Sequence, residues 1–128
     1  MIATSGVVLD ASALLVLLQE EAGAEEVERL LDGATMSAVN LSEVIQKGEQ
    51  HGVDTEGLEY DLEALGIEFR EFDVGIARLT AELWSEGSGL SLGDRACLAL
   101  AGMTGSTAIT ADRRWARADP SVQIRLVR

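Results

Sequence analysis

The chain has 128 residues, 47% of them apolar and 25% charged, a balance typical of one globular domain and not of a disordered chain. Its formal net charge of −12 argues against diffuse electrostatic attraction to nucleic acid, and no apolar run approaches the ~20 residues that span a bilayer. One cysteine and one histidine exclude an internal disulfide and argue against a zinc centre. We therefore expect a single cytoplasmic domain over residues 1–128 that is not attached to a membrane.

Strands alternate with helices along the chain, as the apolar periodicity and the glycines between segments indicate. In chain order the sequence predicts a strand at 6–9, helices at 11–20 and 22–32, a strand at 34–37, helices at 38–50 and 55–65, a strand at 67–72, helices at 73–86 and 93–103, a strand at 106–110, a helical turn at 111–118 and a strand at 122–127. This alternation predicts an α/β fold, a three-layer α/β/α sandwich with a mainly parallel central sheet.

Four carboxylates stand at the ends of predicted elements, each beside an apolar segment. They are Asp10, Glu43, Asp94 and Asp112. Parallel α/β sheets bind ligands at the carboxyl ends of their strands, where all four side chains can face one rim. A carboxylate against an apolar scaffold is costly to ionise unless a cation compensates its charge. Four such groups at one place would most simply hold a hard divalent metal ion.

Each acid also has a purely structural interpretation as a helix cap. The segments NLSE (40–43) and SLGD (91–94) both have the spacing of a capping box, in which the acid accepts a hydrogen bond from the backbone N–H of the cap. Asp10 would cap the helix that begins at residue 11, and Asp112 would stabilise its own helical turn. Four coincident caps are less persuasive than one shared site, but both interpretations stay open.

Four stretches, LDASALLVLL, NLSEV, LSLGDRACLALA and TADRRW, in this order and at these intervals, closely resemble a PIN domain of the VapC toxin type, and the resemblance covers essentially the whole chain. The resemblance implies a parallel α/β/α sandwich and a Mg²⁺- or Mn²⁺-dependent endoribonuclease. It also implies control by a small cognate VapB-type antitoxin, an RNA substrate such as tRNA or rRNA, and a homodimer.

The resemblance assigns roles to particular residues of this chain. The acidic catalytic site falls on Asp10, Glu43, Asp94 and Asp112. From the chemistry of the metal we expect Asp10 and Asp94 to be the principal ligands, whereas Glu43 and Asp112 would complete the pocket, bind a second ion or orient the attacking water. The polar residues expected to support them through hydrogen bonds are Ser12, Asn40 and Thr110. The arginine-rich end of the chain offers Arg113 and Arg114 for contact with the substrate phosphate.

The number of metal ions and the type of protein both have alternatives. Trp115 leaves no further acid shortly after Asp112, so the choice between one ion and two stays open. An aspartate after the first strand also begins the sites of haloacid-dehalogenase-like phosphatases, which carry a second aspartate where this chain has Ser12. The other alternative is a non-catalytic PIN-like module whose acidic pocket receives a basic partner segment.

The remaining conspicuous side chains are expected to pack. Cys97, in an alanine-rich helix, is expected to be a small buried hydrophobe. Trp84 is expected to pack beside its helical neighbours, whereas Trp115 stays open between packing and stacking on a base. The leucines of residues 14–18 cover more than one helix face, so part of that surface is expected to pack on another helix or on a partner.

Overall fold

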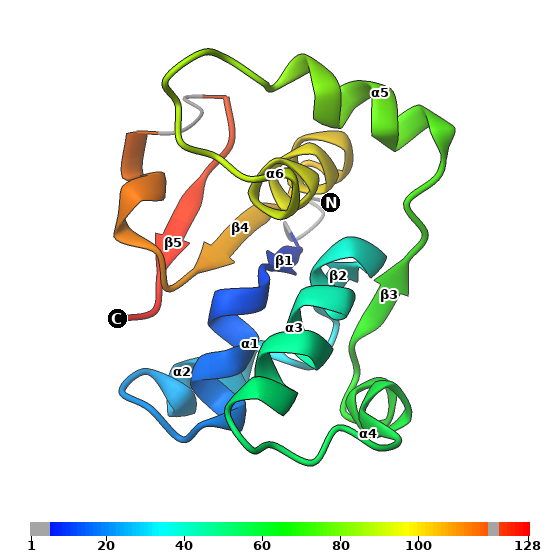
Figure 1. Ribbon diagram of the computed structural model, residues 1–128, viewed down its shortest axis with the longest axis vertical. Helices are drawn as coiled ribbons and strands as arrows, with labels where there is room; N and C mark the ends of the chain where they lie inside the picture. The colour runs from blue at the N-terminus through cyan, green and yellow to red at the C-terminus, as the bar shows by residue number, and fades with distance from the viewer. Residues whose placement is uncertain (1–5, 118–120) are drawn as a thin grey trace, which may run out of the picture.

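The computed structural model describes residues 6–117 and 121–128, and strands alternate with helices as the sequence predicts (Figure 1). The described elements are β1 (Val7–Leu9), α1 (Ala11–Leu18), α2 (Ala24–Leu30), β2 (Thr35–Ser37), α3 (Ala38–Gln50), α4 (Leu58–Ala64), β3 (Glu68–Arg70), α5 (Val74–Glu82), α6 (Leu92–Thr104), β4 (Thr107–Thr110), the 3₁₀ helix η1 (Arg113–Arg117) and β5 (Ile124–Leu126). Residue 118 of the predicted turn lies outside the described residues. No helix within the described ranges is long and apolar enough to cross a membrane.

The strands form one sheet in which each described pair of neighbours is parallel, so the predicted parallel sheet is confirmed. Their order is β3-β2-β1-β4-β5, with β1 in the centre. The chain moves outward from β1 to β3 on one side and later from β4 to β5 on the other. The carboxyl ends of β1 and β4 therefore flank the point where the strand order reverses, which is where open α/β sheets bind ligands.

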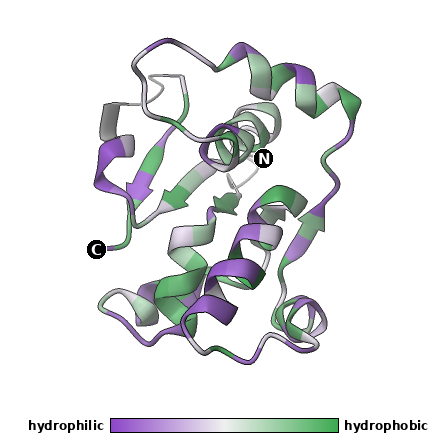
Figure 2. Ribbon diagram, in the orientation of Figure 1, coloured by the Kyte–Doolittle hydropathy of each residue, from purple (hydrophilic) through white to green (hydrophobic). Residues whose placement is uncertain are grey.

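Helices cover both faces of this sheet (Figure 1). Successive side chains of a strand point to opposite faces. Accordingly, Leu9 and Ile109 belong to the core formed with α1, α2, α3 and α4, whereas Val8 and Ala108 belong to the core formed with α5 and α6. Figure 2 shows β1 and β4 as mostly hydrophobic, while α3 and α5 alternate between hydrophilic and hydrophobic residues. The predicted three-layer α/β/α sandwich is confirmed.

The apolar surface of residues 14–18 is covered by the protein itself. Leu14, Leu15 and Val16 are buried, and Leu17 and Leu18 are partly buried against the same core. Helix α1 packs against α2 and α3, so helices of the same chain cover most of this surface. Packing on helices of the same chain is therefore observed, while packing of the remaining surface of Leu17 and Leu18 on a partner stays a prediction.

The two tryptophans lie in contrasting environments. The prediction that Trp84 packs in a helix is wrong, because α5 ends at Glu82 and leaves Trp84 62% exposed in the following loop. Trp115 is fully buried in the core between the sheet and α6, which decides for packing over base stacking. Cys97 is buried in the same core, as predicted.

The last residues of the chain lie against the turn between α1 and α2. A Cβ at Gly23, whose φ is 102°, would collide with the carbonyl oxygen of Val127, so only glycine allows this close approach. Two ion pairs reinforce the contact, Arg125 with Glu26 and Arg128 with Glu21. These contacts fix the end of the chain to the helical layer that carries α1.

Candidate active site

Asp10 follows β1 directly and is the N-cap of α1. Its extended backbone ends the strand, and its Oδ1 accepts a hydrogen bond from the backbone N–H of Ala13 at 2.8 Å. The N–H of Asp10 donates to the carbonyl oxygen of Ile109 on β4 at 3.0 Å. The capping interpretation is thus correct, and the same geometry places the carboxylate at the ends of the two central strands, where the residue is only 4% exposed.

Two hydroxyl groups bind the Asp10 carboxylate. Ser12 Oγ donates to Oδ1 at 2.8 Å, and Thr110 Oγ1 donates to Oδ2 at 2.6 Å. Each hydroxyl also accepts from the backbone after β4, Ser12 Oγ from the N–H of Ala111 at 2.9 Å and Thr110 Oγ1 from the N–H of Asp112 at 3.0 Å. The two hydroxyls therefore connect the first acid of the site to the segment that carries the last one.

Replacing Thr110 with valine should weaken this network while preserving the shape of the side chain. We expect the free energy of unfolding to fall by about 1–3 kcal/mol, because Oδ2 of Asp10 and the backbone N–H of Asp112 each lose a hydrogen-bond partner. Denaturant unfolding measures the loss. Thr107→Val on the same strand is the control, since among the described residues its hydroxyl donates only to the exposed Gln123. Equal losses in the two variants would contradict a special role for Thr110.

Burial raises the pKa of Asp10 to about 6 from its ordinary value of 3.8. Desolvation is the largest cause; hydrogen bonds from Thr110, Ala13 and Ser12 oppose it, and repulsion by Asp94 adds to it. The donors that reach Asp10 from the described residues are neutral hydroxyl and N–H groups, with no lysine or arginine among them. The described residues therefore leave its charge uncompensated, which is the condition that favours binding of an external cation.

Glu43 approaches the same place from α3. This helix begins at the cap Ser37, so Asn40 already lies in its first turn, and the alternative of a capping box at 40–43 is wrong. Instead, Asn40 donates from Nδ2 to Glu43 Oε1 at 2.9 Å and to the carbonyl oxygen of Gly93 at 3.1 Å. A Cβ at Gly93 would collide with the Glu43 carboxylate. The glycine therefore lets α6 approach α3 closely enough for Asn40 to hold Glu43 against it.

Asp94 lies in the first turn of α6 and forms the capping box that the sequence predicts. The N–H of Ser91 donates to Asp94 Oδ2 at 2.9 Å, and the N–H of Asp94 donates to Ser91 Oγ at 3.1 Å. The side chain of Asp94 is only half-buried. Capping uses one oxygen of the Asp94 carboxylate. The other oxygen accepts no hydrogen bond from the described residues, so Asp94 can cap the helix and also bind a metal ion.

Asp112 follows β4 and is bound by an arginine two residues later. Arg114 donates from its backbone N–H and from Nε to Oδ1, at 2.9 and 3.0 Å, and from Nη2 to Oδ2 at 2.6 Å. These hydrogen bonds, above all those from the guanidinium, hold the pKa of Asp112 below its ordinary value. Arg113 is exposed and is not among the described residues that line the site.

One pocket of about 340 Å³ brings all four predicted acids together. The predicted residues among its lining are Asp10, Ser12, Asn40, Glu43, Asp94, Asp112 and Arg114. Thr110 is fully buried and reaches the pocket through its hydrogen bond to Asp10. The rim predicted from the ends of the strands is therefore present as a single cavity. Thr110 lies behind its lining, and Arg113 is not part of the lining.

A hard divalent cation fits the chemistry of this pocket. In the part of the chain that is described, no three Asp, Glu, His or Cys side chains stand close enough to form a ready ligand cluster. Mg²⁺, however, commonly takes one or two carboxylates and keeps several waters. The donors are oxygens, the Asp10 carboxylate is uncompensated, and the buried Oδ1 of Asn40 has no hydrogen-bond partner among the described residues. Asp10 and Asp94 are the carboxylates best suited to hold the ion.

Sequence reasoning missed Lys47, which also lines the pocket. It lies one helical turn after Glu43 on α3, and residues four apart share a helix face, so this spacing could have revealed it. Its exposed ammonium group brings positive charge to a predominantly acidic cavity. Lys47 is therefore a better placed candidate for contact with a phosphate than Arg113.

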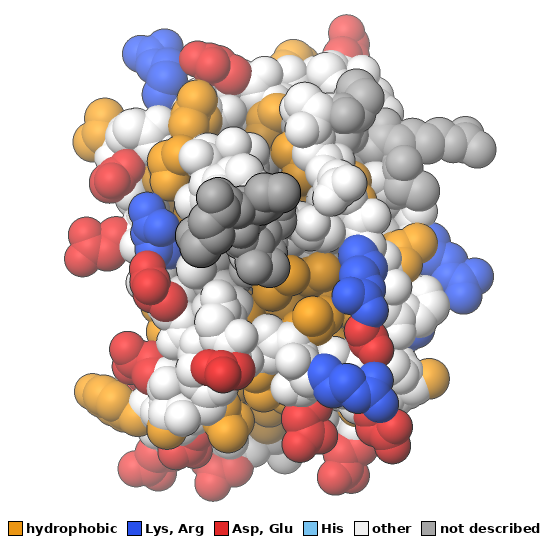
Figure 3. Space-filling view, turned by 180° about the vertical axis from the view of Figure 1, so that it is seen from behind, with side chains coloured by type: hydrophobic (Ala, Val, Ile, Leu, Met, Phe, Trp, Pro, Cys, Tyr) orange, Lys and Arg blue, Asp and Glu red, His pale blue; other side chains and the backbone are white. Residues whose placement is uncertain are grey.

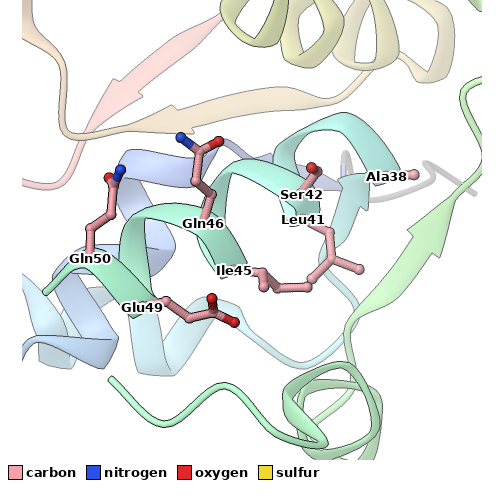
Figure 4. A pocket seen from close by; sticks show the side chains of 7 residues that line it. All are labelled: Ala38, Leu41, Ser42, Ile45, Gln46, Glu49 and Gln50. Atoms are coloured by element: carbon pink, nitrogen blue, oxygen red, sulfur yellow. The ribbon is translucent and has the colours of Figure 1, made fainter. Parts of the chain in front are cut away.

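A larger hollow, of about 710 Å³, lies along α3 and differs in character from the acidic pocket. Figure 4 shows that its lining side chains all come from this helix; they are Ala38, Leu41, Ser42, Ile45, Gln46, Glu49 and Gln50. Glu49 is the single acid among these described residues. The hollow therefore lacks the convergent carboxylates of the smaller pocket, and we place the candidate chemistry in the latter.

The profile of the PIN domain family matches residues 7–120. The chain therefore belongs to the PIN domain family, and the resemblance seen in its motifs is confirmed. No curated protein matches it in sequence.

Solved structures show the same fold at low sequence identity. A toxin–antitoxin complex from Klebsiella pneumoniae aligns with a TM-score of 0.76 and 18% identity, over 96% of this chain and 98% of that one. DNA-bound VapBC from Salmonella typhimurium aligns with a TM-score of 0.73 and 19% identity, over 98% of this chain and 100% of that one. VapBC2 from Rickettsia felis, bound to a DNA fragment from its promoter, aligns with a TM-score of 0.66 and 18% identity, over 93% of this chain and 96% of that one. The fold thus extends over nearly the full length of each compared chain.

Proposed function

We propose that the protein is a VapC-type toxin, a Mg²⁺- or Mn²⁺-dependent endoribonuclease that hydrolyses RNA phosphodiester bonds, with residues 1–128 acting as one nuclease domain. The observation that carries the proposal is the pocket at the reversal of strand order, where buried, uncompensated Asp10 is joined by three further acids. Membership of the PIN domain family supports a nuclease.

A divalent ion held by Asp10 and Asp94 would lower the pKa of a bound water and relieve charge on the scissile phosphate. The chain contributes the orientation of the groups around it. Ser12 and Thr110 fix the Asp10 carboxylate, which makes its geometry independent of substrate. Asn40 binds Oε1 of Glu43, and Oε2, which accepts no hydrogen bond from the described residues, is suited to orient an attacking water.

RNA, such as tRNA or rRNA, would have to be held by the pocket more than by the surface at large. The net charge is −12, and Figure 3 shows acidic side chains gathered along the lower edge of one face of the molecule, with basic ones beside them. Such a surface repels the phosphate backbone. The bound ion and Lys47 would therefore supply the main local attraction for the substrate phosphate.

We further propose a cognate VapB-type antitoxin as partner, since solved structures of this fold include complexes described as toxin–antitoxin assemblies. An arginine from such a partner would form charge-assisted hydrogen bonds with the pocket's carboxylates and compete with the metal ion. A homodimer and a cytoplasmic location, where RNA is available, complete the proposal.

Incubation of the purified, partner-free protein with total tRNA and rRNA tests the proposal. We expect cleavage with Mg²⁺ or Mn²⁺, none with EDTA, and fragments with 5′-phosphate and 3′-hydroxyl ends. Folded protein that leaves all the RNA intact with both ions would contradict the nuclease assignment and favour a non-catalytic partner-binding module. Hydrolysis of small phosphate monoesters, with RNA left intact, would favour the haloacid-dehalogenase-like alternative.

A further inference from the structure

We propose that Arg114 is a resident cation of the pocket, which neutralises Asp112 and restricts the pocket to a single divalent ion on the side of Asp10 and Asp94. The inference rests on the proposed function, which leaves the number of ions open. It assigns the guanidinium of Arg114 to the acids of the site instead of to the substrate phosphate.

The local fold directs Arg114 back onto Asp112. The N–H of Trp115 donates to the carbonyl oxygen of Asp112 at 3.1 Å, and the Trp115 side chain is fully buried, so the start of η1 is anchored in the core. In this tight turn the Arg114 guanidinium meets both carboxylate oxygens, through Nε at 3.0 Å and Nη2 at 2.6 Å. The two parallel contacts form the bidentate pair that gives arginine–carboxylate interactions their strength and fixed geometry.

Positive charge is distributed unequally among the acids of the pocket. Asp112 has a guanidinium on both oxygens, whereas the donors that reach Asp10 from the described residues are neutral. The need for an additional cation is therefore concentrated at Asp10 and not at Asp112.

A second divalent ion would have to displace Arg114. Paired-ion sites place two ions about 3.5–4 Å apart, so a second ion would need further free carboxylate oxygens close to the first. At Asp94 and Glu43 one oxygen of each carboxylate accepts no hydrogen bond from the described residues, but at Asp112 both oxygens are taken by Arg114. With the guanidinium in place, the favourable position for an ion is the one that Asp10 and Asp94 offer.

The number of bound Mn²⁺ ions tests this inference without reference to activity. Isothermal titration calorimetry, with EPR of free Mn²⁺ as a second measurement, counts the ions on the partner-free full chain. We expect one ion on the wild type and two on Arg114→Gln, the second one lost again in the double variant Arg114→Gln/Asp112→Asn. Arg113→Gln, which removes the exposed neighbouring arginine, is the matched control and should bind one ion. Arg114→Lys keeps a positive charge at the site and should also bind one.

Two ions on the wild type, or a single ion on folded Arg114→Gln, would overturn the inference and leave the proposed nuclease standing. Failure of wild type and variants alike to bind Mn²⁺ would overturn both. Circular dichroism confirms that each variant is folded. The number of Mn²⁺ ions on the wild type can overturn the inference by itself, so the test remains decisive even if a variant fails to fold.

Discussion

Asp10→Asn should greatly slow metal-dependent RNA cleavage without destabilising the metal-free protein at neutral pH. A metal ion contributes several kcal/mol of charge stabilisation, so loss of its principal ligand should reduce the rate by about a hundredfold or more. Cleavage of a labelled RNA in Mn²⁺ measures the effect. Asp73→Asn is a matched control, because Asp73 caps α5 with the same geometry but lies outside the described pocket lining. Equal activity of Asp10→Asn and Asp73→Asn would contradict the assignment of Asp10.

The same substitution should change how stability depends on pH. Since the pKa of Asp10 is raised to about 6 in the folded protein from 3.8, the folded state binds more protons than the unfolded state between these values. The contribution of Asp10 to the free energy of unfolding therefore falls as pH rises from about 4 to about 6, and the penalty persists above that range. Its full size is on the order of 2–3 kcal/mol.

Melting curves in EDTA at pH 4 and pH 7.5 reveal this penalty. From the lower to the higher pH, Asp10→Asn should gain stability relative to the wild type, since it has no buried charge to form. Added Mn²⁺ should raise the melting temperature of the wild type and not that of the variant, because a ligand stabilises only the state that binds it. Parallel pH profiles of the two proteins in EDTA would show that Asp10 is not desolvated as described.

Trp115→Ala should destabilise the protein more than any other tryptophan change in the chain. Removing a fully buried tryptophan typically costs about 3–5 kcal/mol, a large part of the total stability of a domain of this size. We expect the melting temperature to fall on the order of 10–20 °C. The loss should also release the start of η1, and with it Asp112 and Arg114.

Trp84→Ala provides the matched control for this change. Its side chain is 62% exposed, so we expect a change within about 0.5 kcal/mol in the free energy of unfolding. Trp115→Phe, which retains most of the buried apolar volume, should lie between the two if Trp115→Ala proves too unstable to purify. Similar melting temperatures for the two alanine variants would contradict the burial of Trp115.

Local patterns were sufficient to predict the architecture, because strand and helix periodicities are strong in this chain. The order of elements and the parallel sheet follow from them, and Ser91 and Asp94 form the capping box that their spacing predicts. The ends of the helices were harder to predict from the sequence. Helix α5 stops before Trp84, and nothing in its apolar spacing indicates where the chain leaves the helix.

The convergence of the acids and the support of Asp10 and Glu43 by Ser12, Thr110 and Asn40 could be predicted, but the arginine partner of Asp112 could not. Asp10 and Asp112 follow adjacent strands, which the alternation of elements indicates. That Arg114 folds back onto Asp112 depends on the tight geometry of η1, where residues two apart can meet, and this does not follow from residue types. The contact of Asn40 with Gly93 joins two helices 53 positions apart in sequence, a pairing that only tertiary packing establishes.

The central position of β1 has a consequence for the newly made chain on the ribosome. Asp10 precedes β4 by about a hundred residues, and one of the two hydroxyls that orient it belongs to Thr110, 100 residues downstream, at the end of the strand that completes the pairing of β1. Contacts between such distant residues cannot form until the intervening chain exists. A chain translated only as far as β3 therefore contains the first acid without the assembled pocket, and a ribonuclease built in this way would acquire its activity only after β4 has been made.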